Sequence, residues 1–356
     1  MNRIIRPTLL VNKSICIVNI DRMAKKAIRN HLTFRPHFKT HQSAEIGEWF
    51  REAGVNAITV SSVSMAHYFA DHGWKDITIA FPCNILEISQ INELASRIRL
   101  NLLVESTEVA SFLANNIHSE TGFFVKIDTG YHRTGIAPKD IPLLNSVLDA
   151  AETNKKLVFK GFLTHTGQTY QAGSLDEIRS LAIRAMETMS GLKEIFNPRF
   201  PGLTLSIGDT PSCSLLDEFP GIDEIRPGNF IFYDLMQYSI GSCTLDDIAV
   251  AIACPVVAVH PERNEAVIYG GAAHLSKESL MHEGKFVFGL AVKYDRNVWN
   301  CNIPFGFVTS LSQEHGIIRI NKDVKLQSGE LIAILPVHSC LAVHELCMNK
   351  VVIEER

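Results

Sequence analysis

The 356 residues are 46% hydrophobic and 20% charged, so the chain can bury a substantial core and a disordered class is excluded. A net charge of −4 without any long run of Lys and Arg argues against nucleic acid as a partner. No apolar segment approaches 18 residues, so we expect no membrane partner, and eight scattered cysteines without a C-x-x-C pair are typical of reduced thiols in a cytoplasmic protein.

Short β-like runs alternate with helix-like segments from about residue 14 to residue 235. A first helix is expected at 14–31, and Ser174 with Glu177 fits a capping box that opens a later one. Eight strands are predicted, at 34–38, 57–60, 76–81, 99–104, 122–127, 158–164, 203–206 and 224–226. This alternation predicts an α/β fold, a (β/α)8 TIM-like barrel, with a doubly wound open sheet as the rival.

The alternation of helix-like and β-like segments ends after about residue 239. Runs such as "IAVAIACPVVAVHPERNEAVIYGG" and "FGFVTSLSQEHGIIRI" are rich in β-branched residues, are broken by Gly, Pro and Asn, and show little helical period. We therefore expect two domains, a barrel over 1–239 and a C-terminal all-β domain over 240–356.

The segment "FRPHFKTHQS" places Lys39 between His37 and His41, directly after the first predicted strand. In a (β/α)8 barrel the chemistry lies at the carboxyl ends of the strands. A partly dehydrated lysine there can lose its proton near neutral pH and attack a carbonyl carbon. The alternative is an ordinary surface lysine at a strand edge.

Two further loops follow predicted strands. In "LSIGDTPSC", Gly208, Asp209 and Thr210 offer backbone N–H groups and a hydroxyl that suit a phosphate. In "KIDTGYHRTGI", Arg133 is suited to bind a carboxylate with two hydrogen bonds, although an ion pair with Asp128 would explain it equally well. A third loop, "THTGQTY", offers His165, Gln168 and Tyr170.

The C-terminal run "PVHSC" contains His338 and Cys340, which project from one face if the segment is a strand. An imidazole and a thiolate form a partial zinc ligand set, whereas a buried histidine beside an inert thiol is the commoner situation. Glu314 and His315, in "QEHGIIRI", are candidate neighbours of this pair.

Taken together and in order, these motifs resemble the fold-type III pyridoxal-phosphate enzymes. The similarity is greatest to the branch with D-threonine aldolase, D-serine dehydratase and D-threo-3-hydroxyaspartate dehydratase, and it covers nearly the whole chain. It is carried by "RPHFKTH", "DTGYHRTG", "THTGQTY", "GDTPSC", "RPGNFIFYDLMQ", "EHG" and "PVHSC". The resemblance implies an alanine racemase-like barrel with a β domain, assembled head-to-tail into a homodimer.

The resemblance also implies roles for individual residues. Lys39 would be the catalytic residue, joined covalently to the aldehyde of pyridoxal 5′-phosphate. His338 and Cys340 would hold a divalent metal, with zinc as the first candidate and manganese or magnesium as others. The remaining cofactor-binding residues would be Gly208, Asp209 and Thr210 at the phosphate, and Arg133, Tyr170 and Tyr233 elsewhere around the cofactor.

The implied activity is a lyase acting on β-hydroxy-D-amino acids. Lys39 would remove the Cα proton in a dehydratase, whereas an aldolase breaks the Cα–Cβ bond. Cys340 favours the dehydratase, since aspartate at this position goes with aldolases, and Gln168 stands where the family usually has histidine. An amino-acid racemase, a non-catalytic pyridoxal-phosphate-binding protein and a barrel without cofactor remain alternatives, and the sequence does not identify the D-amino acid.

Overall fold

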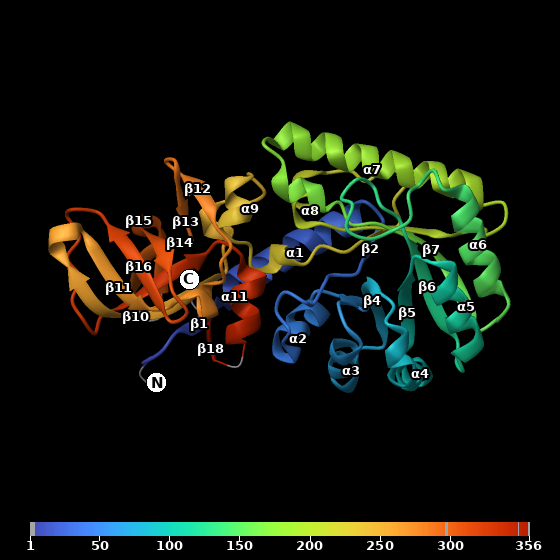
Figure 1. Cartoon of the computed structure of the whole chain (residues 1–356), viewed down its shortest axis with the longest axis horizontal. Helices are drawn as coiled ribbons and strands as arrows, with labels where there is room; N and C mark the ends of the chain where they lie inside the picture. The colour runs from blue at the N-terminus through green and yellow to red at the C-terminus, as the bar shows by residue number, and fades with distance from the viewer. Residues whose placement is uncertain (1–3, 296–297, 348, 355–356) are drawn as a thin grey trace. The chain divides into compact units, whose positions relative to one another are not determined.

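A computed structural model describes residues 4–295, 298–347 and 349–354 (Figure 1). The chain divides into two compact units, and each is described separately. One unit comprises Arg22–Lys39 and Ser43–Gly228. The other comprises the chain up to Asp21, the short stretch Thr40–Gln42, and everything from Asn229 onward. The two-domain boundary near residue 239 stays a prediction.

The first unit is a parallel eight-stranded barrel. The strands pair in the order β2-β9-β8-β7-β6-β5-β4-β3, and a bridge between His37 and Thr59 joins the two outer strands. This closure confirms the predicted barrel and rules out the doubly wound sheet, whose outer strands do not meet. The strands are β2 (Thr33–Phe34), β3 (Ile58–Val60), β4 (Asp76–Pro82), β5 (Arg99–Val104), β6 (Thr121–Lys126), β7 (Leu157–Leu163), β8 (Thr204–Ile207) and β9 (Glu224–Ile225).

Helices connect the barrel strands, and Figure 1 shows α3, α4 and α5 on the outer side of β4, β5 and β6. Serine side chains cap several of them, including Ser174, whose Oγ accepts from the N–H of Glu177 as the predicted capping box requires. The Glu177 carboxylate, however, accepts from the N–H of Gly173. The helices are α1 (Lys13–Arg29), α2 (Ala44–Glu52), α3 (Val63–Asp71), α4 (Ile88–Arg97), α5 (Thr107–Asn116), α6 (Ile141–Glu152), α7 (Leu175–Phe196) and α8 (Thr210–Leu215), with 3-10 turns η1 (Ile85–Glu87) and η2 (Gly167–Gln171).

The second unit is built on an eight-stranded, mainly antiparallel sheet in the order β11-β16-β15-β14-β17-β10-β1-β18, and β11 also pairs with β10. The strands are β1 (Thr8–Asn12), β10 (Val250–His260), β11 (Glu265–Tyr269), β14 (Gly289–Asp295), β15 (Val298–Leu311), β16 (His315–Ile320), β17 (Leu331–Pro336) and β18 (Lys350–Ile353), with a separate hairpin of β12 (Leu280–His282) and β13 (Lys285–Val287). The predicted β-rich C-terminal region is confirmed.

Two features of this second unit were not predicted. The strand β1 comes from the chain's beginning and is buried along its whole length between β10 and β18. Short helices also interrupt the β structure. These are α9 (Leu235–Ser239), α10 (Ala272–Leu275) and α11 (Ser339–Leu346), with 3-10 turns η3 (Asn229–Ile231), η4 (Leu245–Asp247) and η5 (Pro261–Arg263).

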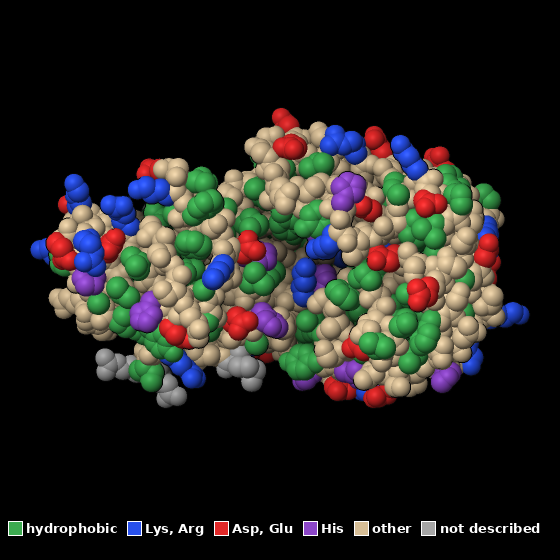
Figure 2. Space-filling model, in the orientation of Figure 1, with side chains coloured by type: hydrophobic (Ala, Val, Ile, Leu, Met, Phe, Trp, Pro, Cys, Tyr) green, Lys and Arg blue, Asp and Glu red, His purple; other side chains and the backbone are tan. Residues whose placement is uncertain are grey.

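The structure also shows how charged side chains and cysteines are distributed. On the face drawn in Figure 2, Lys and Arg side chains are interspersed with Asp and Glu. All eight cysteines are free in the described structure. Of the helices in the described ranges, none has both the length and the apolar character needed to cross a bilayer.

Candidate active site

Lys39 follows a segment that the barrel holds rigidly. The N–H of His37 donates to the carbonyl of Pro227, and the N–H of Phe38 donates to that of Thr59. The Phe38 ring is fully buried, with its centroid about 5 Å from the rings of a phenylalanine and tryptophan cluster: Phe50, Phe69 and Trp74. Lys39 itself is exposed at the carboxyl end of this segment. Its backbone is therefore fixed while its amine is accessible.

The predicted phosphate loop joins β8 to α8. Asp209 caps α8, because its Oδ1 accepts from the N–H of Ser212 at 2.7 Å and from the Thr169 hydroxyl at 3.0 Å. Burial raises the pKa of Asp209 to about 6. At Gly208 a Cβ would lie 2.9 Å from the backbone carbonyl oxygen of Arg226, so only glycine fits there.

Three buried polar atoms in this loop have no hydrogen-bond partner among the described residues. They are Asp209 Oδ2, Thr210 Oγ1 and Ser212 Oγ. Buried polar atoms are normally paired, because each unpaired one costs about 1–3 kcal/mol. The Thr210 and Ser212 hydroxyls can donate to an anionic ligand, whereas Asp209 Oδ2 can do so only when protonated, and phosphate binding at this loop stays a prediction.

Tyr170 and Gln168 lie on η2, next to this loop. The Tyr170 hydroxyl accepts from the backbone N–H of Thr210 at 3.2 Å. The Gln168 amide nitrogen donates to the carbonyl of Thr129, and its buried Oε1 lacks a partner in the described structure. Gln168 therefore holds the loop after β6 in place through its amide group.

His165 lies at the end of β7, beneath the phosphate loop. Its Nδ1 lies within hydrogen-bond distance of the carbonyl oxygen of Gly208, which only accepts, so this nitrogen carries the proton. Burial, together with the nearby charges of Lys39 and Lys126, lowers the pKa of His165 well below its usual range. The imidazole is therefore neutral, with an unprotonated Nε2.

The loop after β6 satisfies Asp128 without Arg133. Asp128 Oδ1 accepts from the backbone N–H groups of Gly130, Tyr131 and His132, and its Oδ2 lies 2.9 Å from the His132 ring. The Arg133 guanidinium lies over the Tyr131 ring, 4.9 Å from its centroid. The alternative interpretation, an Arg133–Asp128 ion pair, is not formed in the described structure.

Two buried cationic residues at the carboxyl ends of the strands were missed. Lys126 ends β6, and burial lowers its pKa to about 7. Arg226 follows β9, where its Nε donates to the Ser206 hydroxyl, and burial lowers its pKa to about 10. A charged residue closing an otherwise apolar strand, as in "FFVK", was the available signal.

The predicted metal pair is not on a strand. The strand β17 ends at Pro336, His338 caps α11, and Cys340 lies in its first turn. The helix begins here, where the N–H of Ala342 donates to the carbonyl of His338. Burial alone would lower the pKa of His338, but a hydrogen bond to Cys340 and the charges of Cys340 and Asp234 raise it to about 9. The two side chains therefore do face one another.

Hydrogen-bonding groups surround both members of the pair. The Thr40 hydroxyl lies 3.3 Å from the Cys340 sulfur, and the Asn229 amide nitrogen lies 3.7 Å from it. Asp234 Oδ2 lies 3.5 Å from Nδ1 of His338. No third His, Cys, Asp or Glu within the described ranges completes a ligand group. An imidazole beside a thiol fits a metal held by two protein ligands, whose other positions are left to water or substrate.

The other proposed residues near this pair are placed differently. Glu314 lies 3.7 Å from His274, and His315 pairs with Tyr269 between β16 and β11; neither forms an ion pair with His338 in the described structure. Tyr233 is buried with φ of 47°, a left-handed conformation that is uncommon for an aromatic residue. Such strained positions are enriched at functional sites.

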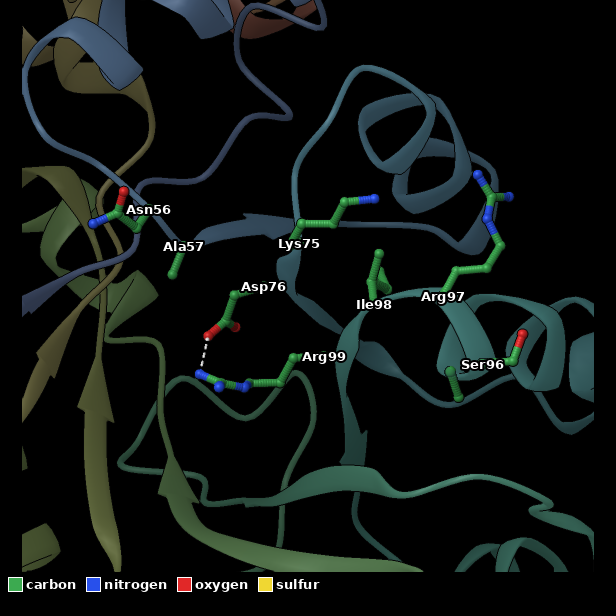
Figure 3. Close-up of a pocket in the computed structure, with 9 residues that line it drawn as sticks. Asn56, Ala57, Lys75, Asp76, Ser96, Arg97, Ile98 and Arg99 are labelled. Atoms are coloured by element: carbon green, nitrogen blue, oxygen red, sulfur yellow. Dashed lines mark hydrogen bonds and ion pairs between the residues drawn. The ribbon is translucent and has the colours of Figure 1, made fainter.

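The hollow drawn in Figure 3 lies near the amino ends of the barrel strands, whereas Lys39 and the loop after β8 lie at the carboxyl ends. It has a volume of about 550 Å³ and is lined by residues at the starts of β4 and β5. Asp76 and Arg99 within it form an ion pair at 3.1 Å. This hollow therefore contains none of the predicted site residues.

Comparisons with known proteins agree with this geometry. A family model described as the alanine racemase N-terminal domain matches residues 16–235, and one described as a putative serine dehydratase domain matches 249–352. A D-serine dehydratase from Dictyostelium discoideum is 32% identical, over 96% of this chain and 91% of the relative. A D-threo-3-hydroxyaspartate dehydratase from Delftia sp. (strain HT23) is 28% identical, over 90% and 87%.

Solved structures give the same result. The Delftia enzyme superposes with a TM-score of 0.87 at 25% identity, covering 95% of this chain and 92% of that one. A mutant of that dehydratase, described as being in the metal-free form, superposes with a TM-score of 0.88. The chain therefore belongs to the fold-type III pyridoxal-phosphate family with an alanine racemase-like barrel, in the branch of the D-serine and D-threo-3-hydroxyaspartate dehydratases and the D-threonine aldolases.

Proposed function

We propose that this chain is a pyridoxal-phosphate- and metal-dependent lyase of β-hydroxy-D-amino acids, with elimination of the hydroxyl favoured over aldol cleavage. The observation that carries the proposal is the combination of an accessible amine on a rigid backbone, at Lys39, with a phosphate loop whose buried polar atoms lack protein partners. The two relatives named above are dehydratases of D-serine and of D-threo-3-hydroxyaspartate, which supports the same class for this chain.

The barrel residues suit pyridoxal phosphate. Gly208, Asp209 and Thr210 would hold the phosphate, and Arg133, Tyr170 and Tyr233 would contact other parts of the cofactor. When bound, this cofactor withdraws electrons from the Cα atom of an attached amino acid. The Lys39 amine, once released from the cofactor aldehyde, would accept the Cα proton at Nζ. A neutral His165 would help to position the groups around Lys39, and it would add no positive charge beside the Lys39 amine.

The residues of the second unit suit a divalent cation. His338 and Cys340 would be its protein ligands, and an imidazole with a soft thiolate favours zinc over manganese or magnesium. A divalent metal supplies Lewis-acid stabilisation to a β-hydroxyl that must depart or lose a proton. Loss of the Cα proton and the β-hydroxyl gives an enamine, which hydrolyses to a 2-oxo acid and ammonia. We also propose a cytoplasmic, head-to-tail homodimer, on the strength of the family resemblance.

Borohydride reduction followed by peptide mapping tests the central claim. The protein loaded with pyridoxal phosphate is expected to carry the reduced adduct on Lys39, and the Lys39→Ala variant is expected to carry none. An adduct on another lysine, or a protein whose absorption ignores added pyridoxal phosphate, would overturn the proposal.

Substrate assays separate the reactions. D-serine, D-threonine and D-threo-3-hydroxyaspartate would each be assayed for 2-oxo acid, which elimination gives, and for glycine, which aldol cleavage gives. Racemisation of alanine or serine by a protein that holds no metal would favour a racemase.

A further inference from the structure

A buried carboxylate lies beside the proposed metal ligands, and its contacts fix its position. Asp234 has no exposed surface. Its Oδ2 accepts from the Asn229 amide at 2.7 Å and from the backbone N–H of Ser339 at 2.9 Å, and its Oδ1 accepts from the N–H of Gln237 at 2.9 Å. Three donors around two oxygens hold the carboxylate in one orientation.

One ring nitrogen of His338 faces this carboxylate. Nδ1 lies 3.5 Å from Asp234 Oδ2, on the segment that also presents the N–H of Ser339 to the same oxygen. An ionised carboxylate only accepts hydrogen bonds, so the nitrogen that faces it is the one that carries hydrogen. When a metal displaces hydrogen from one ring nitrogen, the hydrogen that remains stays on Nδ1, which faces the carboxylate, and the metal binds the lone pair of Nε2.

We propose that Asp234 is a positioning residue for the metal. It holds His338 in the tautomer with hydrogen on Nδ1, so that Nε2 is the ligating atom, and it sets the orientation of the ring relative to Cys340. Carboxylates placed behind metal-binding histidines act in this way in other proteins, and removing them weakens metal binding about 10–100-fold. This inference rests on the proposed function, because it requires His338 to bind a metal.

Asp234 also has a structural role, which the test must separate. It caps α9 through Oδ1, a role that asparagine fills equally well. Asp140 provides a control for the loss of a capping carboxylate. It is exposed, it caps α6 by accepting from the N–H of Leu143, and it forms no ion pair with a histidine in the described structure. Asp234→Asn changes the acceptor that faces His338 and also turns an amide NH2 toward the donors of Asn229 and Ser339, whereas Asp140→Asn changes only an exposed helix cap.

The experiment measures zinc affinity by competition with a chromophoric chelator, using the full-length protein loaded with pyridoxal phosphate. Asp234→Asn is expected to bind zinc about 10–100-fold more weakly than the parent, and Asp140→Asn is expected to bind it equally well. The absorption of the bound pyridoxal phosphate is expected to be the same in all three proteins. Equal zinc affinity of Asp234→Asn and the parent would overturn the inference.

Two further measurements keep the test decisive. In the parent loaded with zinc, nitrogen NMR with His338→Gln for assignment is expected to show hydrogen on Nδ1 and metal on Nε2. Metal on Nδ1 would overturn the inference even if Asp234→Asn failed to fold. A parent that binds no zinc, or a His338→Gln variant that binds it as well as the parent, would instead overturn the proposed metal site.

Discussion

Buried polar groups lack protein partners at one end of the barrel and form ion pairs at the other. At the carboxyl end of β8, Asp209 Oδ2 and the Thr210 and Ser212 hydroxyls are buried without protein partners in the described structure. Near the amino ends, Arg35 donates to both Glu224 and Asp76, the first residues of β9 and β4. Figure 3 shows the further pairing of Asp76 with Arg99. The carboxyl end leaves buried polar groups available to a ligand, whereas at the amino end such groups form ion pairs with one another.

This contrast has an energetic meaning. Burial alone would lower the pKa of Arg35, but the charges of Glu224 and Asp76 raise it above its usual value, so the amino-end network favours its charged state. At the carboxyl end, burial raises the pKa of Asp209, so the folded protein disfavours the charged carboxylate there. We conclude that the amino end stabilises the fold, whereas the carboxyl end holds two unpaired hydroxyls, at Thr210 and Ser212, whose cost hydrogen bonds to a bound ligand would relieve.

The largest effect is expected from breaking the amino-end network. Arg35→Met leaves Glu224, which is 2% exposed, without its cationic partner. Removing one member of a buried pair costs about 3–5 kcal/mol of unfolding free energy. Urea unfolding of the protein without cofactor would measure this loss. Borohydride labelling of Lys39 in the folded fraction should be unchanged, so a loss below about 1 kcal/mol or a loss of labelling would contradict the division of roles.

A pH-dependent effect is expected at the carboxyl end. The folded protein holds a proton on Asp209 up to about pH 6, whereas in the unfolded chain the aspartate releases it near its ordinary pKa of 3.8. This group therefore costs stability as pH rises from about 4 to 6, and the full cost, about 3 kcal/mol, is present above that range. Asp209→Asn keeps the helix cap and removes the titration.

The measurement compares Asp209→Asn with the parent, both without cofactor, by urea unfolding at several pH values. The variant is expected to gain stability relative to the parent between pH 4 and pH 7. A difference that stays constant over this range would show that Asp209 does not oppose folding at the carboxyl end.

Features of the barrel that depend on neighbouring residues could be predicted from the sequence. Barrel strands are local apolar runs, and the predicted strand at 99–104 coincides with β5 (Arg99–Val104). The loops holding Lys39, Asp209 and Thr210 follow predicted strands, and turn-forming residues marked them as functional candidates. Features encoded within a few neighbouring residues were therefore accessible from sequence.

Features made by distant partners were not. Thr8–Leu10 pair with Ile252 and its neighbours, more than 240 residues away, so no local pattern identified β1 as a strand of that sheet. His338 and Cys340 were assigned to a strand because "ILPVHSC" is β-like, whereas the following residues form α11. Asp234 and Arg226 acquire their roles only through contacts across the fold.

The smallest expected effect comes from two matched threonines, one toward each end. Thr210 Oγ1 is buried without a partner, whereas the buried Thr78 hydroxyl in β4 accepts from the Asn101 amide at 3.2 Å. Thr210→Val should not lower the stability of the protein without cofactor, because it removes an unsatisfied hydroxyl. It should weaken pyridoxal-phosphate binding about tenfold or more, because it removes a donor to a charged phosphate.

Thr78→Val should behave in the opposite way. It leaves the Asn101 amide unsatisfied and should cost about 1–2 kcal/mol of unfolding free energy, with pyridoxal-phosphate affinity unchanged. Urea unfolding and a titration of the cofactor's absorption would measure both quantities for both variants. If Thr210→Val instead lost stability and kept its cofactor affinity, the Thr210 hydroxyl would be an ordinary part of the core. The carboxyl end would then be stabilised in the same way as the amino end, and the cost assigned to its open polar groups would have to come from Asp209 alone.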